Sequence, residues 1–257
     1  MKQDTAAMKL WKILYPLLFY YALVLITMTI AQWVIGADNE SYVACQLAAT
    51  VVAIPCMLPF YRQDQALRGI ARGKLRVEKE HLVHGLWAAA IVILISVPLN
   101  NMICMTPLVE MSAGFHEANA GFYGSTLILE LISSAFATPI LEELVFRGIV
   151  FGRLLDMLGR TAAVLLSAFC FALVHFNIVQ FIYAFLVGIV LALLMERAGH
   201  VYAAIVGHIA ANFVAVIRTE TGFLDSMLSG SALAWGISAA LLAAGIALLW
   251  WYICKIR

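Results

Sequence analysis

A few ionisable or amide side chains lie inside apolar stretches of this sequence, within the segments LEELVFRG, FALVHF and GHIAAN. They are Glu142, Glu143, Arg147, His175, His208 and Asn212. A charged side chain near the centre of a bilayer costs roughly 2.5 to 3.5 kcal/mol even on the lenient insertion scale, so such groups normally face the bundle interior and have partners. The three segments therefore predict a buried polar site.

The spacing of these residues indicates how they pair. Glu143 and Arg147 are four residues apart with the acid first, which is the favourable order for an ion pair on a helix. Glu142 lies about 100° around the helix and is left unpaired, so its carboxyl is free to exchange a proton with a reacting group. His208 and Asn212 are also four apart, and one helix face therefore presents an imidazole and an amide.

Depth along the helices predicts a second pairing. Glu142 and His175 each lie about 16 or 17 residues from the polar turn at 158–160, which is roughly 24 Å of helix. The two side chains are thus expected to form a pair. His208 lies only about 8 to 10 residues beyond the next turn, at 197–199, and reaches the same depth only if its helix tilts or that turn is recessed.

The elements that position these residues are membrane spans. The chain is 64% hydrophobic and only 12% charged, with a mean hydropathy of +0.95, far more apolar than a soluble domain. Apolar stretches predict eight spans at about 12–35, 42–61, 83–105, 123–141, 161–178, 179–196, 201–218 and 231–252. We expect an all-α polytopic membrane helix bundle with a buried polar catalytic cavity, forming a single integral membrane domain over residues 1–257.

The segment 123–158 is too long for one straight span. An uninterrupted helix there would measure about 54 Å, against a hydrocarbon core of about 30 Å. Pro139 is the expected kink, because proline removes a backbone donor and clashes with the preceding turn. Gly148 and Gly152 form a GxxxG pair that predicts the close approach of another helix. Glu130 lies in the same segment, and no role follows from its position.

Basic residues alternate along the chain in a way that predicts topology. They gather in the N-terminus, the 62–80 loop, the 147–160 segment and the C-terminal tail, whereas acidic residues occupy the intervening gaps near 38–40 and 110–117. The positive-inside rule then places both termini in the cytoplasm of a multi-pass protein of the cell membrane. The lipid bilayer is its expected partner, and a net charge of +1 argues against nucleic acid.

The three segments resemble motifs of a known family. EELVFR matches EExxxR, FALVH matches FxxxH and HIAAN matches HxxxN of the CPBP family, the CAAX proteases and bacteriocin-processing enzymes also called Abi. The resemblance implies a helical intramembrane endopeptidase in which Glu142 and His175 activate water while His208 and Asn212 stabilise the oxyanion. Glu143 and Arg147 then support the helix that presents Glu142. General acid–base and oxyanion chemistry agree with these roles.

Three alternatives remain open at this point. Two histidines and a glutamate from different helices could bind a catalytic zinc ion, although the sequence has no HExxH helix, so we expect no metal or other cofactor. A non-catalytic membrane immunity or peptide-binding protein of the same fold would keep the motifs without turnover. A transporter is disfavoured because hydropathy shows no inverted repeats. The expected partner is a membrane-associated peptide or protein, possibly lipidated, such as a CAAX tail, a leader peptide or a prepeptide.

Overall fold

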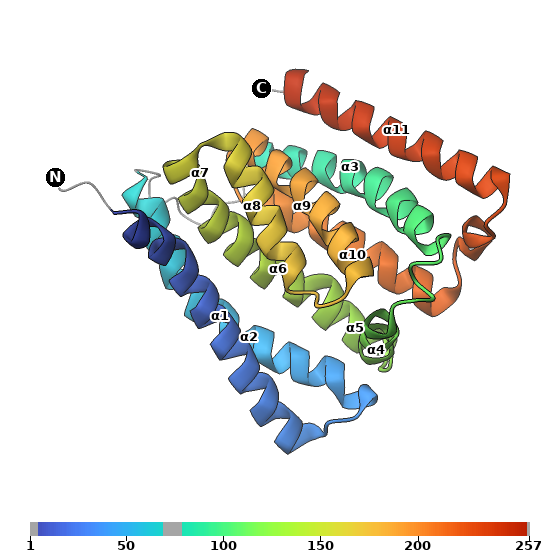
Figure 1. Ribbon diagram of the computed structural model, residues 1–257, viewed down its shortest axis with the longest axis horizontal. Coiled ribbons are helices and arrows are strands. Elements are labelled where there is room, and N and C mark those ends of the chain that lie inside the picture. The colour runs from blue at the N-terminus through green and yellow to red at the C-terminus, as the bar shows by residue number, and fades with distance from the viewer. Residues whose placement is uncertain (1–4, 69–78, 256–257) are drawn as a thin grey trace.

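The computed structural model of the protein describes residues 5–68 and 79–255, and within these ranges it is a bundle of helices without a strand (Figure 1). The N-terminal helices are α1 (Ala6–Ile35), α2 (Asn39–Leu67) and α3 (Lys79–Cys104). The C-terminal helices are α8 (Arg160–Leu173), α9 (Ile178–Ala198), α10 (Tyr202–Thr221) and α11 (Ala232–Lys255), with the short 3₁₀ helix η3 (Asp225–Leu228) before the last. The predicted all-α fold is confirmed.

The middle of the chain contains a sharp bend and two π-helical segments. After α4 (Ala113–Phe122) the chain turns by 108° into one long helix over 127–158. This helix consists of α5 (Leu127–Glu130), η1 (Leu131–Ala137), α6 (Thr138–Glu143), η2 (Leu144–Phe151) and α7 (Gly152–Leu158). The predicted kink at Pro139 is therefore corrected. The large bend lies at 123–126, and the helix accommodates Pro139 by a π-helical segment directly before it.

The number of spans is close to the prediction. Six helices in the described ranges are long and apolar enough to cross a membrane, or seven if α4 and the long helix form one broken span. The fifth predicted stretch, 161–178, is shorter than expected: α8 has 14 residues and ends at Leu173, because residues 174–177 form a turn. This turn contains His175, one of the predicted site residues.

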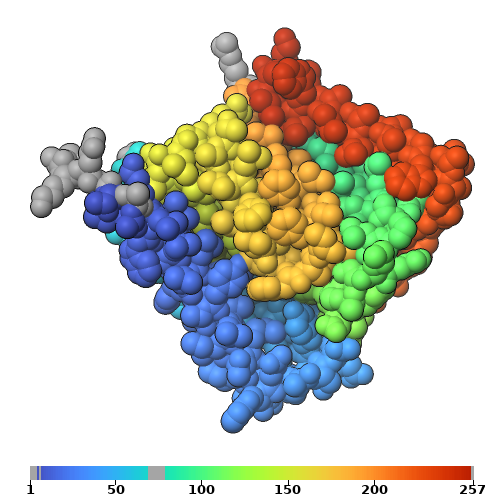
Figure 2. All heavy atoms as spheres, viewed as in Figure 1, coloured from blue at the N-terminus to red at the C-terminus, as the bar shows by residue number. Residues whose placement is uncertain are grey.

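Large apolar side chains cover the outside of the bundle. Trp33 on α1 is 90% exposed, Leu86 on α3 is 73% exposed and Trp250 on α11 is 70% exposed. Apolar surface of this extent is unfavourable in water and favourable in lipid. Figure 2 shows α8 and α9 between the α1–α2 hairpin and α11, so the outer helices flank a layered bundle. These observations confirm a polytopic membrane protein.

The interior has two apolar cores that share one helix. One core surrounds the long helix and includes Phe146 and Phe151, and the other joins α3, α10 and α11 and includes Ile91 and Tyr252. Helix α9 contributes residues to both cores. Polar groups of the long helix and of α10 can meet only between these cores, and this is where the candidate site lies.

The GxxxG pair makes the predicted close contact with a neighbouring helix. A Cβ atom on Gly148 would lie 2.7 Å from Cδ2 of Tyr61, and one on Gly152 would lie 2.5 Å from the guanidinium of Arg68. Tyr61 belongs to α2, and Arg68 is the residue that directly follows its last turn. The absence of side chains at the two glycines therefore lets α2 pack directly against η2 and α7, as small-xxx-small patterns do in membranes.

The termini of several helices meet at one end of the bundle. Arg153 donates two hydrogen bonds to Asp64 and one to the carbonyl of Lys12, and Arg160 pairs with Glu196 at 2.7 Å. The end of α2 and the connection between α7 and α8, where basic residues gather in the sequence, thus lie next to each other. We refer to this as the basic end.

The start of α3 and the end of α11 belong to the same neighbourhood. His84 Nδ1 lies 2.6 Å from the Tyr252 hydroxyl, and the rings of His84 and His200 are 5.9 Å apart between centroids. His200 lies in the turn after α9, two residues beyond its last residue, while Glu196 pairs with Arg160 of α8. The beginning of α3, the turn between α9 and α10 and the end of α11 therefore all lie at the basic end.

Gly148→Ala should destabilise the protein, because its new Cβ meets the rigid ring of Tyr61. Overpacking of this kind costs about 1 to 3 kcal/mol. Thermal unfolding of the detergent-purified protein, followed by tryptophan fluorescence, should show a lower Tm than for the wild type. Gly236→Ala is the matched control, because a Cβ at that helical position of α11 meets no atom within 4 Å. An equal Tm for both variants would contradict the packing role of Gly148.

Candidate active site

The centre of the site is a buried ion pair. Arg147 Nη1 lies 2.9 Å from Glu143 Oε1, and both side chains are fully excluded from solvent. The predicted pairing at i and i+4 is confirmed. A charge at this depth is tolerated only with a partner and further hydrogen bonds, so the surroundings of the guanidinium decide whether the pair is stable.

Two neighbouring helices complete the environment of Arg147. Nη2 donates to the carbonyl of Gly188 on α9 at 3.1 Å, and the guanidinium carbon lies 4.4 Å from the centre of the Phe171 ring of α8. A Cβ on Gly188 would lie 3.0 Å from Nη2, so the glycine makes room for the charge. Arg147 thereby connects the long helix with α8 and α9 through a hydrogen bond and a cation–π contact.

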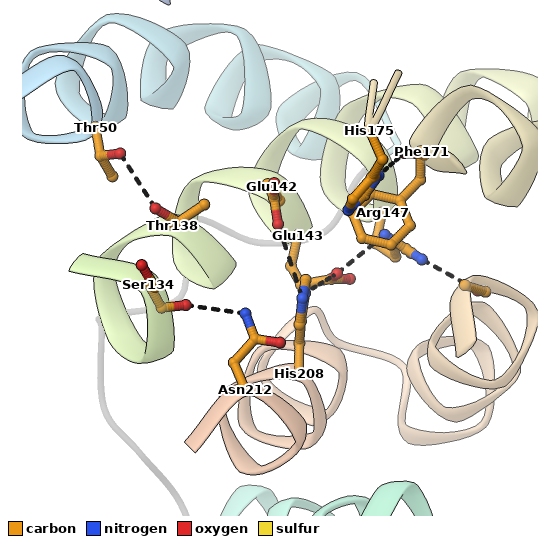
Figure 3. A network of polar contacts seen from close by, with 11 residues as sticks. Thr50, Ser134, Thr138, Glu142, Glu143, Arg147, Phe171, His175, His208 and Asn212 are labelled. Atoms are coloured by element: carbon orange, nitrogen blue, oxygen red, sulfur yellow. Dashed lines mark hydrogen bonds and ion pairs between the residues drawn. The ribbon is translucent and has the colours of Figure 1, made fainter. Parts of the chain in front are cut away.

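His208 joins the two glutamates. Its Nδ1 lies 2.8 Å from Glu143 Oε1, and its Nε2 lies 3.7 Å from Glu142 Oε2 (Figure 3). Glu143 Oε1 also accepts from Arg147 Nη1, so Nδ1 of His208 is assigned as the donor to the same oxygen. Nε2 then faces Glu142, and Glu143 fixes the orientation of the imidazole.

His208 reaches the glutamates although its helix is entered only a short distance before it. Helix α10 begins six residues earlier, at Tyr202, and the residue before it, Val201, is buried. Both ring nitrogens of His200, in the same turn, are also buried, whereas Gly199 at the tip of the turn is exposed. The turn between α9 and α10 is therefore partly buried at the basic end, and His208 contacts both glutamates from the second turn of α10.

His175 lies in a constrained turn between α8 and α9. Its Nδ1 is 3.1 Å from the carbonyl of Phe171, an acceptor, so Nδ1 carries the proton and Nε2 retains a lone pair. Asn177 caps α9 by accepting from the Gln180 amide and also donates to the His175 carbonyl. Phe176 has a φ of 53°, an unfavourable backbone conformation for a residue with a side chain. These contacts fix the imidazole at the end of the helix.

Asn212 interacts with the π-helical segment of the long helix. The Thr138 amide donates to the Ser133 carbonyl, five residues earlier. The next donor in that register would be residue 139, which is proline and has no N–H. Asn212 Nδ2 instead donates to the Ser134 carbonyl at 2.9 Å (Figure 3). One N–H of Asn212 thus replaces the bond that Pro139 cannot make, and the second N–H is available to the cavity.

The predicted site residues share one cavity. It has a volume of about 960 Å³ and is lined by Glu142, His175, His208 and Asn212, while Glu143 and Arg147 lie behind its wall. In the described chain no hydrogen bond joins Glu142 directly to His175. A pairing of these two residues would have to run through a bound molecule. This is also the arrangement that activation of a water molecule requires.

The structure brings two further residues to the site, Phe171 and Arg218, for which no role was predicted. Phe171 is the first residue of the FxxxH motif. Its ring packs on the guanidinium of Arg147, and its carbonyl accepts a hydrogen bond from His175 Nδ1. Arg218 lines the same cavity. It could have been noticed in the sequence, because no acidic residue lies three or four positions from it on its apolar helix. Glu130 is buried and accepts from the Ser125 amide at 3.1 Å, away from the cavity wall.

Together these features define a helical membrane protein with a Glu–Arg–His cluster beside an internal cavity, and comparisons with known proteins agree with this class. Residues 124–214 match the family described as "Type II CAAX prenyl endopeptidase Rce1-like". A stretch of 93 residues is 32% identical to the protein named "Putative membrane peptidase YdiL" of Bacillus subtilis (strain 168), covering 36% of this chain and 38% of that protein. No solved structure matches. This region of the chain is thus similar to CAAX prenyl endopeptidases, in agreement with the resemblance that the three motifs indicated.

The contact between Asn212 and the Ser134 carbonyl can be tested by a double-mutant cycle. Asn212→Ala should destabilise the protein by about 1 to 3 kcal/mol, because a buried acceptor loses its donor. Pro139→Ala returns a backbone N–H to that carbonyl, so Asn212→Ala should cost clearly less in the Pro139→Ala background. Unfolding in mixed detergent micelles measures all four proteins. Additive effects of the two substitutions would contradict the proposed replacement.

Proposed function

We propose that the protein is an intramembrane endopeptidase that hydrolyses a peptide bond of a membrane-associated substrate with Glu142 as the general base. The observation that carries this proposal is the contrast between the two neighbouring glutamates. Glu143 forms hydrogen bonds with Arg147 and His208, whereas Glu142 lies on the cavity wall with only a 3.7 Å contact to His208. A carboxyl without a fixed hydrogen-bond partner, facing a cavity, is the group able to accept a proton from water.

The geometry supports a specific division of roles. Glu142 takes a proton from water, and the lone pair on His175 Nε2 helps to orient that water. The water oxygen bonds to the carbonyl carbon, and the negative charge that develops on the carbonyl oxygen is stabilised by the free N–H of Asn212 and by His208 Nε2. His208 Nε2 can donate there only when both ring nitrogens carry a proton. When the carbon–nitrogen bond breaks, Glu142 returns its proton to the leaving amine.

A zinc-dependent form of the same reaction is the chemical alternative. No group of three or more His, Cys, Asp or Glu side chains in the described ranges is arranged to hold a metal ion. The hydrogen bond from His175 Nδ1 to the Phe171 carbonyl leaves Nε2 as the one nitrogen of that ring able to bind a metal. The proposed mechanism therefore uses these side chains without a metal ion. A chelator separates the two mechanisms, because it should inhibit only the zinc-dependent one.

The cavity has a direction within the bundle. It extends from the glutamates toward Gln32, Asn100 and Arg218, which lie in the last turns of α1, α3 and α10, away from the basic end. If both termini face the cytoplasm of the cell membrane, as the basic residues predict, the cavity opens in the outer half of the bilayer. We propose that substrate enters from that side, which favours a leader peptide or prepeptide over a cytoplasmic tail.

Glu142→Gln should abolish peptide cleavage while leaving Tm nearly unchanged. The amide keeps the size of the side chain but cannot accept the proton, so the rate should fall at least about 100-fold. Glu143→Gln is the matched comparison: it leaves Arg147 buried without a counter-charge and should cost about 3 to 5 kcal/mol of stability. The assay uses protein in nanodiscs with a library of membrane-anchored peptides, read by mass spectrometry with and without a strong chelator.

The outcomes separate the candidate functions. Cleavage that is lost in Glu142→Gln and in His175→Ala, and that is indifferent to the chelator, supports the metal-free mechanism. Loss on chelation with recovery on added zinc would assign the same residues to a metal site. A folded wild type that binds peptide without cleaving it would favour the immunity or peptide-binding alternative. Cleavage that survives Glu142→Gln would overturn the assignment of the base.

The proposed orientation can be tested with single cysteines. Thr161→Cys lies beside Arg160 at the basic end, Ser226→Cys lies in η3 at the opposite end, and both positions are exposed. In a background in which the five native cysteines are replaced by serine, a membrane-impermeant maleimide should label Ser226→Cys on intact cells and Thr161→Cys only after lysis. The reverse pattern would place the cavity on the cytoplasmic side and remove the preference for an outer substrate.

A further inference from the structure

The cavity contains a buried cation that the proposed chemistry does not use. Arg218, in the last turn of α10, is 6% exposed, and its Nη2 is buried without a hydrogen-bond partner. Its Nη1 donates to Oδ1 of Asn101 on α3, and Asn101 in turn donates to the Ser238 hydroxyl at 3.4 Å. No carboxylate in the described residues pairs with it. An unpaired guanidinium inside a membrane protein is costly, and such residues commonly mark the path of a charged ligand.

Arg218 lies on the same helix face as the candidate site residues. The residues of α10 that follow one another at helical spacing along the cavity wall are His208, Ala211, Asn212, Ala215, Arg218 and Thr219. Arg218 is ten residues beyond His208 and six beyond Asn212, or about 15 Å and 9 Å along the helix axis. An extended peptide rises by about 3.3 Å per residue, so the separation corresponds to roughly three to five residues of substrate.

The charge of the cavity wall makes Arg218 distinctive. It is the one lysine or arginine among the described residues that line the cavity, and apolar and aromatic side chains such as Val179, Tyr183 and Val187 surround most of the volume. The hydrogen bonds from Arg218 to Asn101 and from Asn101 to Ser238 hold the guanidinium in place and leave Nη2 unused. Asp225 also lines the cavity, but no ion pair joins it to Arg218 in the described structure. A guanidinium held in this way, with a free donor and no paired carboxylate, matches a carboxylate of a ligand, which can accept a short charge-assisted hydrogen bond.

We propose that Arg218 binds a carboxylate of the substrate, about three to five residues from the peptide bond that is hydrolysed beside Glu142 and His175. This inference rests on the proposed endopeptidase function for the position of the scissile bond, although the binding step can be measured without turnover. The carboxylate belongs either to the C-terminus of the peptide or to an Asp or Glu side chain. Arg218 is a binding residue and takes no part in proton transfer.

The alternative to ligand binding is a purely structural role for Arg218. A basic residue in the last turn of a helix interacts favourably with the helix dipole, and the bond to Asn101 holds α10 against α3. That role needs Nη1 and the positive charge and leaves Nη2 without a function. It predicts an effect of substitution on stability, with no dependence on the charge of a bound peptide. The two roles are therefore separated by comparing ligands that differ only in a carboxylate.

The test is equilibrium binding of dansyl-labelled peptides to the full-length protein in nanodiscs of zwitterionic lipid. The probes are Val-Leu-Ala with a free C-terminus, the same peptide as its C-terminal amide, and the amides of Val-Leu-Asp and Val-Leu-Asn. We expect the free acid to bind at least about tenfold more tightly than its amide if the C-terminus is recognised. If a side chain is recognised, the aspartate peptide should exceed the asparagine peptide by a similar factor.

Three variants decide whether Arg218 is responsible. Arg218→Gln should remove the preference for the carboxylate, whereas Arg160→Gln, which changes an exposed arginine at the basic end, should retain it. Asn101→Asp supplies a carboxylate to Arg218 within the protein and should also abolish the preference, with the fold retained. It keeps the test valid if Arg218→Gln is unstable.

The outcomes are distinct from those of the cleavage assay. Equal affinity of the wild type for acid and amide probes, or no binding of either, would overturn the proposal. A preference that survives in both Arg218→Gln and Asn101→Asp would also overturn it. A wild type that binds the acid preferentially and cleaves no peptide would retain the role of Arg218 and contradict the endopeptidase function alone.

Discussion

The candidate site depends on one constraint, which is that a guanidinium buried between apolar cores must be neutralised and hydrogen-bonded. Arg147 meets this requirement with Glu143 on its own helix, the Gly188 carbonyl on α9 and the Phe171 ring on α8. These contacts determine which helices surround the long helix. They also hold Glu143 in place, so that of the two adjacent glutamates only Glu142 is without a fixed partner and available for the proposed chemistry. The Glu143–Arg147 pair is thus structural.

A second feature follows from the backbone of the long helix. Its two π-helical segments lie directly before and after the turn that holds Pro139, Glu142 and Glu143. Proline in a membrane helix leaves a carbonyl without its donor, and local π geometry together with polar groups of neighbouring helices can compensate. Here Gln46 of α2 accepts from the hydroxyls of Ser133 and Ser134, and Asn212 of α10 donates to the Ser134 carbonyl. The same amide that supports the fold therefore lies beside the proposed reacting group.

Under the proposed function, the cavity combines these features with a path for the substrate. Its deep part holds the carboxyl and two imidazoles, and its far part holds the unpaired Arg218 some 15 Å along α10. The wall between them is largely apolar, which suits the side chains of an extended peptide drawn from the membrane. A charged contact at one end and chemistry at the other would fix the register of the peptide, so that the bond attacked is selected by its distance from the carboxylate.

The sequence by itself determined those features that depend on a single helix. Apolar stretches predicted the spans, the i and i+4 spacing predicted the Glu143–Arg147 pair, and the GxxxG pair predicted the contact that α2 makes. These follow from helix geometry, which relates residues a few positions apart whatever surrounds them. The order of the three motifs also indicated the resemblance to CAAX proteases, and all three motifs fall within the matched residues 124–214.

Only the tertiary structure decided the contacts between helices. Helix α10 brings His208 to both glutamates, the bend lies at 123–126 instead of Pro139, and Asn212 bonds to the long helix. A π-helical turn adds a residue and rotates everything after it, so spacing in the sequence does not fix the distances between side chains of different helices. The sequence shows that no acidic residue lies one helical turn from Arg218, and the structure adds that no carboxylate of another described helix forms an ion pair with it.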